Sequence, residues 1–290
     1  MQIIQSLSQV SGQYQALFVD LWGCVHDGVR AIPGAVEALT AYRRAGGRGV
    51  LVTNSPPPRE GVAKQIAGFG VPEDAYDAIA TSGDSARLSL FRGAVGSRVW
   101  HLGPDHDLGF FEPPAILSDP ITITRVPLDQ AEGVVCTGPF DPQADPSVMR
   151  PEFLAAKTRG LKLLCANPDI VVDRGEVREW CAGALAELYS EMGGESLYFG
   201  KPHPPIYDLA RRRLAAVADV PDSAILAIGD GPLTDAAGAM GEDLDLLFIS
   251  GGLGAAETGT VQGGSPDPAK LEVYLAETGV VPTYVIGTLR

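Results

Sequence analysis

Residues 15–28 read QALFVDLWGCVHDG, and this stretch decides the fold. Its apolar run, ALFV, has the length of a buried strand and stops at the carboxylate of Asp20. A loop with two glycines follows. Pro33 is well placed to open a helix, and Val36 and Leu39 then recur at helical spacing. The stretch predicts a buried strand that ends at Asp20, followed by a loop and then a helix.

The same alternation continues along the chain. A second strand, RGVLVT, ends at Thr53, and a third, YDAIA, runs into Thr81. Between them lies a helical pattern that closes at Gly70. Alternating strands and helices predict a parallel sheet covered on both faces, and ligands of such sheets bind outside the carboxyl ends of the strands. The polar residues at these strand ends are therefore candidates for one site.

From about Gly96 to about Asp173 the sequence changes character, with four strand-like runs separated by proline-rich joints. We interpret this stretch as a second α/β lobe inserted into the first. The first pattern then resumes with SLYFG before Lys201, AILAIGD ending at Asp230, and LDLLFIS. The predicted domains are a Rossmann-like α/β core, residues 1–82 and 183–290, and an inserted domain, residues 83–182.

Charged and hydroxyl side chains follow the core strands in a fixed order. They are an acid, a hydroxyl with an amide, a lysine and a pair of acids: Asp20, Thr53, Asn54, Lys201, Asp230 and Asp235. Each alone is more often a capping, turn or surface residue. Their joint position at the carboxyl ends of parallel strands favours a phosphoryl-transfer site.

The acids suit a nucleophile beside a metal ion. A carboxylate such as Asp20 can attack phosphorus and form an aspartyl phosphate, which divides hydrolysis into two steps. A cation must bridge the carboxylate and the phosphate, and Mg²⁺ prefers oxygen ligands. We expect these from Asp20, Asp230 and the backbone carbonyl of Trp22, with Asp235 as a direct ligand or the holder of a metal-bound water.

The remaining residues suit the phosphate. Lys201 supplies a fixed positive charge next to the carboxylate and the phosphoryl group. The hydroxyl of Thr53 and nearby groups of Asn54 would hold the phosphoryl oxygens. Catalysis would then consist mainly of positioning and charge stabilisation.

This ordered set resembles the four motifs of the haloacid dehalogenase (HAD) superfamily, and its details resemble subclass IIA, the branch of nitrophenylphosphatase-like and sugar-phosphatase-like proteins. The resemblance covers nearly the whole chain. The four motifs are DLWGCVHDG, VLVTNS, YFGKPHPPIY and AIGDGPLTDAAGA. An insertion between the second and third motifs implies a type-2 cap domain, which in such proteins covers the site and shapes substrate choice.

The chain departs from the family pattern at Trp22. Phosphatases of this family carry a second aspartate there, which protonates the leaving group and then activates water. An indole has no proton to shuttle, and loss of a general acid–base removes about 10²–10⁴ in rate. Three interpretations stay open: another proton carrier such as His26 or Asp27, a substrate with a good leaving group, or a weakly active or non-catalytic phosphometabolite-binding protein. Trp22 itself could stack on a substrate ring or sugar face.

The composition sets the limits on partners. The formal net charge is −14 and the pI about 4.6, which disfavours nucleic acid as a partner. The N-terminal stretch does not resemble a signal peptide, and no apolar run has the length of a membrane span. We expect a cytoplasmic hydrolase that acts on a small phosphate monoester, with a sugar phosphate among the candidates. Assembly into a homo-oligomer is left open.

Overall fold

The computed structural model describes residues 1–174, 177–261 and 263–290. Internal contacts divide the chain into two compact units. The first comprises residues 1–53, 63–80 and 207–290, and the second comprises residues 54–62 and 81–206. The second unit is thus an insertion into the sequence of the first.

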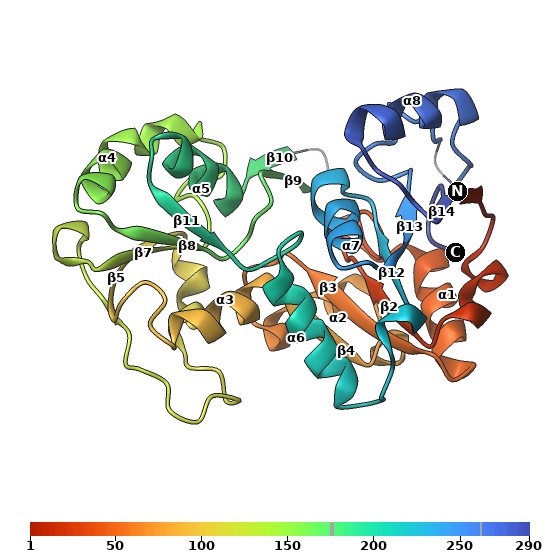
Figure 1. Ribbon diagram of the computed structural model, residues 1–290, viewed down its shortest axis with the longest axis horizontal. Helices are drawn as coiled ribbons and strands as arrows, with labels where there is room; N and C mark the ends of the chain where they lie inside the picture. The colour runs from red at the N-terminus through yellow and green to blue at the C-terminus, as the bar shows by residue number, and fades with distance from the viewer. Residues whose placement is uncertain (175–176, 262) are drawn as a thin grey trace. The chain divides into compact units, whose positions relative to one another are not determined.

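The first unit is built on a seven-stranded sheet in the order β1-β14-β13-β12-β2-β3-β4 (Figure 1). The pairings from β1 through to β3 are all parallel. The strands are β1 Gln2–Ile3, β2 Ala16–Val19, β3 Arg48–Thr53, β4 Ala78–Thr81, β12 Ile225–Gly229, β13 Asp245–Ile249 and β14 Tyr284–Ile286.

The order of these strands creates a switch point at the middle of the sheet. From β2 the chain moves outward through β3 and β4, and it later returns at β12 and moves the other way through β13 and β14. Strands β2 and β12 are therefore neighbours, with Val19 paired to Ile228. In open α/β sheets the crevice at such a switch point is where ligands bind.

Helices cover this sheet, and its central strands are buried. The helices are α1 Pro33–Arg44, α7 Ala237–Gly241 and α8 Pro268–Thr278, together with α2 Arg59–Phe69 and α6 Pro204–Ala215, most of whose residues fall in this unit. All four residues of β2 and all five of β12 are buried. Both chain ends lie beside β14 (Figure 1), where Leu7 N donates a hydrogen bond to Arg290 O (2.7 Å).

The second unit has a five-stranded sheet of its own in the order β11-β8-β7-β5-β6, with all four pairings parallel. A separate antiparallel hairpin joins β9 to β10. The elements are α3 Ser82–Leu90, β5 Arg98–Leu102, β6 Thr124–Arg125, β7 Gly133–Cys136, α4 Arg150–Thr158, β8 Lys162–Cys165, β9 Val171–Arg174, β10 Val177–Trp180, α5 Ala182–Glu191 and β11 Glu195–Tyr198.

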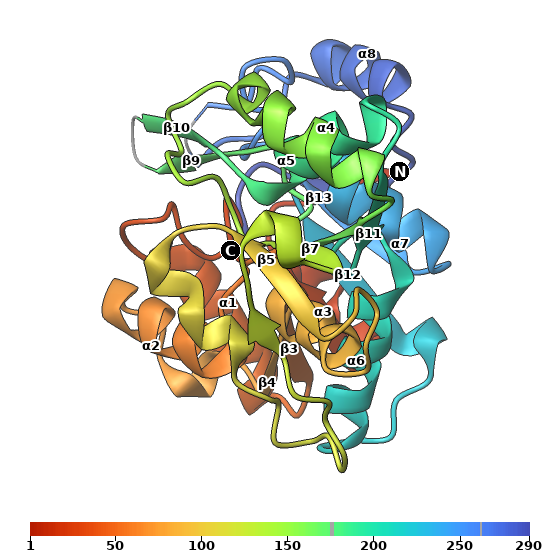
Figure 2. The ribbon, with the colours of Figure 1, turned by 90° about the vertical axis from the view of Figure 1, so that its left-hand side faces the viewer.

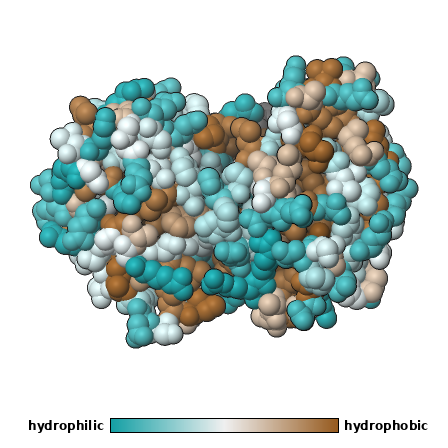
Figure 3. Space-filling view, in the orientation of Figure 1, coloured by the Kyte–Doolittle hydropathy of each residue, from teal (hydrophilic) through white to brown (hydrophobic). Residues whose placement is uncertain are grey.

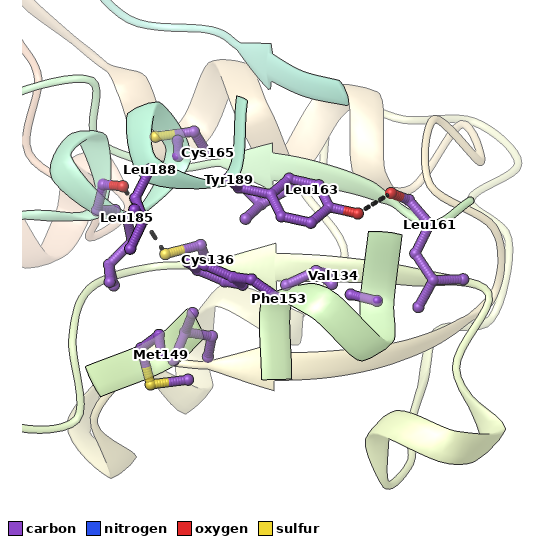
Figure 4. Packing of buried hydrophobic residues seen from close by; sticks show 14 of the residues in the cluster. Val134, Cys136, Met149, Phe153, Leu161, Leu163, Cys165, Leu185, Leu188 and Tyr189 are labelled. Atoms are coloured by element: carbon purple, nitrogen blue, oxygen red, sulfur yellow. Dashed lines mark hydrogen bonds between the residues drawn. The ribbon is translucent and has the colours of Figure 1, made fainter. Parts of the chain in front are cut away.

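Separate apolar clusters pack on the two faces of this second sheet, and Figure 2 shows its strands with the helices α3, α4 and α5 of the same unit. Helices α4 and α5 bring Phe153 and Tyr189 together at a ring separation of 5.2 Å on one face. The Tyr189 hydroxyl donates to Leu161 O (2.5 Å), which satisfies the one polar atom of that buried ring (Figure 4). Helix α3 contributes Leu90 to the cluster on the other face.

The predicted fold class is confirmed: the chain is α/β, with a parallel core sheet and an inserted α/β domain. One strand needs correction, because β11, which the sequence analysis assigned to the core, pairs with β8 in the second sheet. The sequence analysis assigned it to the core because SLYFG directly precedes Lys201, and a local pattern does not show which sheet a strand joins. The limits of the predicted domains remain a prediction.

The surface mixes hydrophilic and hydrophobic residues, as the view in Figure 3 shows. Within the ranges that the structure describes, no helix combines the length and the apolar character needed to cross a lipid bilayer.

Candidate functional site

Asp20 and Asp230 lie at the switch point of the first sheet. Each follows the last residue of its strand, β2 or β12, and Asp20 N donates to Ile228 O (2.9 Å), which extends the pairing by one residue. Both side chains are buried, with exposed fractions of 7% and 4%. Two acids thus follow the ends of adjacent parallel strands.

Asp230 is enclosed by two glycine-containing loops. Gly23 adopts φ +70°, and a Cβ there would lie 2.2 Å from Asp230 Oδ2. A Cβ on Gly252 would lie 1.9 Å from the same oxygen, and Leu253 N donates a hydrogen bond to it (2.9 Å). The loop after β13 therefore belongs to the site, and only glycine allows its backbone to approach the carboxylate this closely.

The arrangement of Asp20, Cys24 and Asp230 fits a metal ion. A carboxylate oxygen from each acid and the sulfur of Cys24 all lie within 4.8 Å of one another, and all three residues are buried. Two carboxylates this close repel each other unless a cation or a proton lies between them. The donor set therefore fits a divalent cation on its own chemistry.

Cys24 was not among the candidate metal ligands of the sequence analysis. The available signal was its place four residues after Asp20 on the same loop.

Asp235 follows Asp230 by five residues in the sequence. Asp235 Oδ2 accepts hydrogen bonds from Gly231 N (3.2 Å) and Thr234 Oγ1 (3.4 Å). A Cβ added to Gly229 would lie 2.2 Å from the Cβ of Asp235. Its predicted part in metal binding remains a prediction.

Trp22 and His26 pack together on the loop after β2. The Trp22 ring is half-buried and meets the His26 ring edge-on at 5.1 Å, and a Cβ on Gly28 would lie 2.3 Å from the indole. On its other side His26 meets Phe69 at 5.1 Å. Gly28, at φ +85°, is thus required by the close approach of the indole.

The environment of His26 suits a residue that orders this loop. Its Nδ1 accepts a hydrogen bond from Gly28 N (3.0 Å), and the residue is 1% exposed. Burial lowers the pKa of His26 to about 4, so the ring is neutral near pH 7. Asp27 is exposed, and its Oδ1 accepts hydrogen bonds from Val29 N and Arg30 N of its own turn. A proton-carrying role for either residue remains a prediction.

Thr53 is the last residue of β3 and is 1% exposed. Thr53 therefore lies at the carboxyl edge of the first sheet, and its strand is the neighbour of β2, the strand that Asp20 follows.

In the second unit, Asn54 holds the backbone of Lys201. Asn54 Oδ1 accepts from Lys201 N (2.7 Å), and Asn54 Nδ2 donates to Lys201 O (3.1 Å) and to Asp169 Oδ1 (2.8 Å). Both hydrogens of the amide thus have partners within the protein. These bonds suit a positioning role for the Asn54 side chain, and the predicted part of Asn54 in phosphate binding remains a prediction.

Comparisons with known proteins agree with this geometry. Family models described as haloacid dehalogenase-like hydrolase and HAD-hydrolase-like match residues 17–112 and 198–285. The structure is similar to that of a hydrolase of the haloacid dehalogenase-like family from Brucella suis 1330, at 39% identity over 99% of this chain and 100% of that one, with a TM-score of 0.85. The chain therefore belongs to the haloacid dehalogenase-like hydrolases, and the predicted family is confirmed.

More distant structures share the fold. A possible sugar phosphatase of the HAD superfamily from Cytophaga hutchinsonii is 20% identical over 99% of this chain and 98% of that one, with a TM-score of 0.73. Glycerol phosphate phosphatase from Mycobacterium tuberculosis, crystallised with magnesium, is 22% identical over 97% of this chain and 77% of that one, with a TM-score of 0.67. A search of curated proteins gave no match.

Proposed function

We propose that the protein is a Mg²⁺-dependent phosphatase that hydrolyses a small phosphate monoester, a sugar phosphate among the candidates, through an aspartyl phosphate on Asp20. The observation that carries this proposal is the closeness of the Asp20 and Asp230 carboxylates at the switch point of the core sheet. A crevice that brings two buried acids together there suits an anionic ligand only with a divalent cation bound.

The fold relatives support the same substrate class. One of them is a possible sugar phosphatase and another a glycerol phosphate phosphatase, and the latter was crystallised with magnesium and with calcium. Both substrates are small phosphorylated metabolites. We extend that substrate class, and the preference for a divalent cation, to this chain.

The reaction would run on the residues of the motifs. An Asp20 carboxylate oxygen attacks phosphorus, the ester bond breaks, and the leaving oxygen takes up a proton; water then cleaves the aspartyl phosphate and restores the carboxylate. Asp20, Asp230, the Trp22 carbonyl and Asp235 would hold Mg²⁺, which when bound neutralises the facing negative charges.

The phosphoryl group would be held by two residues from the other motifs. The Thr53 hydroxyl would donate to a phosphoryl oxygen. The ammonium group of Lys201 would balance its charge, and Asn54 would fix the backbone from which that side chain extends.

Neither Trp22 nor His26 is well suited to protonate the leaving oxygen. Trp22 has no acidic proton, and His26 is buried, neutral and hydrogen-bonded to the loop through Nδ1. We therefore expect turnover to depend steeply on the leaving group, with aryl or acyl phosphates favoured over alkyl esters. The alternative is a weakly active or non-catalytic phosphometabolite-binding protein. In such a protein the half-buried Trp22 would stack on a ring or sugar face of the ligand.

Phosphate release from a graded series of aryl and alkyl phosphates, with Mg²⁺ present, tests the proposal. Asp20→Asn should abolish release, while Asp243→Asn, the same change at an exposed position outside the motifs, should leave it unchanged. Trp22→Asp should raise the rate on alkyl esters by about 10²–10⁴-fold and flatten the dependence on the leaving group. Trp22→Phe should do neither.

The alternative function makes a different prediction. No release from any ester, together with a rise in melting temperature when inorganic phosphate and Mg²⁺ are added, would reject the phosphatase and favour the binding protein. Unchanged alkyl turnover in Trp22→Asp would show that another group carries the proton.

A further inference from the structure

Cys24 places a sulfur atom beside the two carboxylates that would hold Mg²⁺. Its Sγ lies within 4.8 Å of a carboxylate oxygen of Asp20 and of Asp230, and the residue has an exposed fraction of 0%. Zinc binds sulfur at about 2.3 Å and carboxylate oxygen at about 2.0–2.2 Å, so these atoms are close to the separation that one ion spans. All three ligand atoms belong to the first unit.

The backbone of the loop fixes the position of this thiol. Val25 N and His26 N both donate to Leu21 O, at 2.8 and 3.1 Å, and Gly23 N donates to His26 O (3.0 Å). Cys24 thus lies inside a closed turn whose tight bend depends on the positive φ of Gly23. A buried side chain on a backbone held in this way is preorganised, so little conformational entropy is lost when it binds an ion.

The chemistry of sulfur differs from that of the other ligands. Carboxylate and carbonyl oxygens suit Mg²⁺, Ca²⁺ and Mn²⁺, whereas a thiolate favours softer cations such as Zn²⁺. Two carboxylates with a thiol form a mixed set. Such a set can serve a hard cation through its oxygens and a softer cation through its sulfur as well.

We propose that Cys24 is a sulfur ligand that gives this centre a second preference, for thiophilic divalent cations such as Zn²⁺, Co²⁺ and Cd²⁺. Coordination replaces the S–H bond with a metal–sulfur bond and releases the proton to solvent. The proposal rests on the metal centre of the proposed function. It adds that the softer cations compete with Mg²⁺ at the same place, and that Cys24 determines how strongly they do so.

The other cysteines do not share this setting. Cys165 Sγ donates to Asn167 O (3.2 Å), and Cys136 Sγ lies 4.0 Å from the carbonyl oxygens of Gly138 and Ala182. Among residues 1–174, 177–261 and 263–290, the group of Asp20, Cys24 and Asp230 is the one cluster of three such ligands with metal-binding separation. Cys165→Ser therefore serves as a matched control.

Co²⁺ provides a readout that is independent of turnover, because a cobalt–sulfur bond absorbs in the near ultraviolet. The full-length protein is titrated with Co²⁺, and the sulfur-to-cobalt band should appear in the wild type and in Cys165→Ser but be lost in Cys24→Ser. Calorimetric titration should show that Cys24→Ser weakens Cd²⁺ binding by about 10-fold or more while changing Mg²⁺ binding little.

The proposal is overturned if Co²⁺ fails to bind, if it binds without the sulfur band, or if Cys24→Ser keeps both the band and the Cd²⁺ affinity. Folding of each variant is checked by its melting temperature with and without Mg²⁺. Cobalt binding through sulfur without Mg²⁺-dependent phosphate release would reject the proposed function alone. Phosphate release without the band would reject this inference alone.

Discussion

His26 shows how one buried side chain can make the stability of the loop after β2 depend on pH. Its pKa is about 4 in the folded chain and 6.5 when unperturbed, because burial disfavours the charged ring. Between these values the unfolded chain binds more protons, so the free energy of unfolding rises with pH. The contribution is complete above pH 6.5 and is lost as the pH falls towards 4, by about 3 kcal/mol in total.

We predict that His26→Asn flattens the pH dependence of the unfolding free energy between about pH 6.5 and 4. Asparagine keeps an acceptor for Gly28 N but does not titrate, which isolates the effect of the proton. Urea denaturation at a series of pH values measures it. His101, whose pKa burial also lowers to about 4, should preserve part of the slope. An imidazole signal from His26 that titrates near 6.5 would contradict the prediction.

The sequence was most informative about residues that end core strands. Asp20 and Asp230 follow short apolar runs, and parallel strands bring their carboxyl ends to one edge, so their closeness follows from pattern alone. The spacing of Cys24 from Asp20 places it on the same loop, but the direction of its side chain could not be predicted, because it depends on local turns such as those closed by Leu21 O. A lone cysteine in a sequence also gives no indication of which carboxylates will surround it.

At the scale of elements, most predicted strands exist, but their assignment to a sheet was less certain. Strand β11 was assigned to the core from its place just before Lys201, yet it pairs with β8. The β9–β10 hairpin was not predicted, since its two strands are only four residues long each and mix valines with charged residues. Pairing is decided by packing over long sequence separations, which local pattern does not contain.

The bonds between Asn54 and Lys201 join residues 147 positions apart, and they make the loop after β11 dependent on one amide. Asn54→Ala would leave the Lys201 N and O without these partners, at a cost of about 1–3 kcal/mol for a buried polar group. We predict faster amide hydrogen exchange in the peptide that contains Lys201, together with a loss of kcat/KM.

Asn167→Ala is the matched control for this prediction. Asn167 Oδ1 accepts from Asp169 N (3.0 Å) in the same region, so its removal disturbs the neighbouring loop but leaves the Lys201 bonds intact. Exchange at Lys201 should then match the wild type. Equal exchange at Lys201 in wild type and Asn54→Ala would show that the amide does not position this residue.

At the scale of the whole molecule, the candidate metal centre lies in one of two units, each with its own sheet and apolar core. Ligand binding stabilises only the part of a protein that must be folded to bind. Mg²⁺ at about 100 times its Kd should therefore add about 2.7 kcal/mol to the unfolding free energy of the first unit. Calorimetry with and without Mg²⁺ measures this increase.

Asp230→Asn separates the two effects that this centre has on stability. Without metal, the variant removes the repulsion between two carboxylates whose oxygens lie within 4.8 Å, so its melting temperature should not fall below that of the wild type. With Mg²⁺, it should fail to gain the stabilisation. Asp243→Asn makes the same change of charge at an exposed position and should respond to Mg²⁺ like the wild type. If Asp230→Asn were stabilised by Mg²⁺ as much as the wild type, the ion would bind elsewhere, and the phosphatase proposal would lose its metal centre.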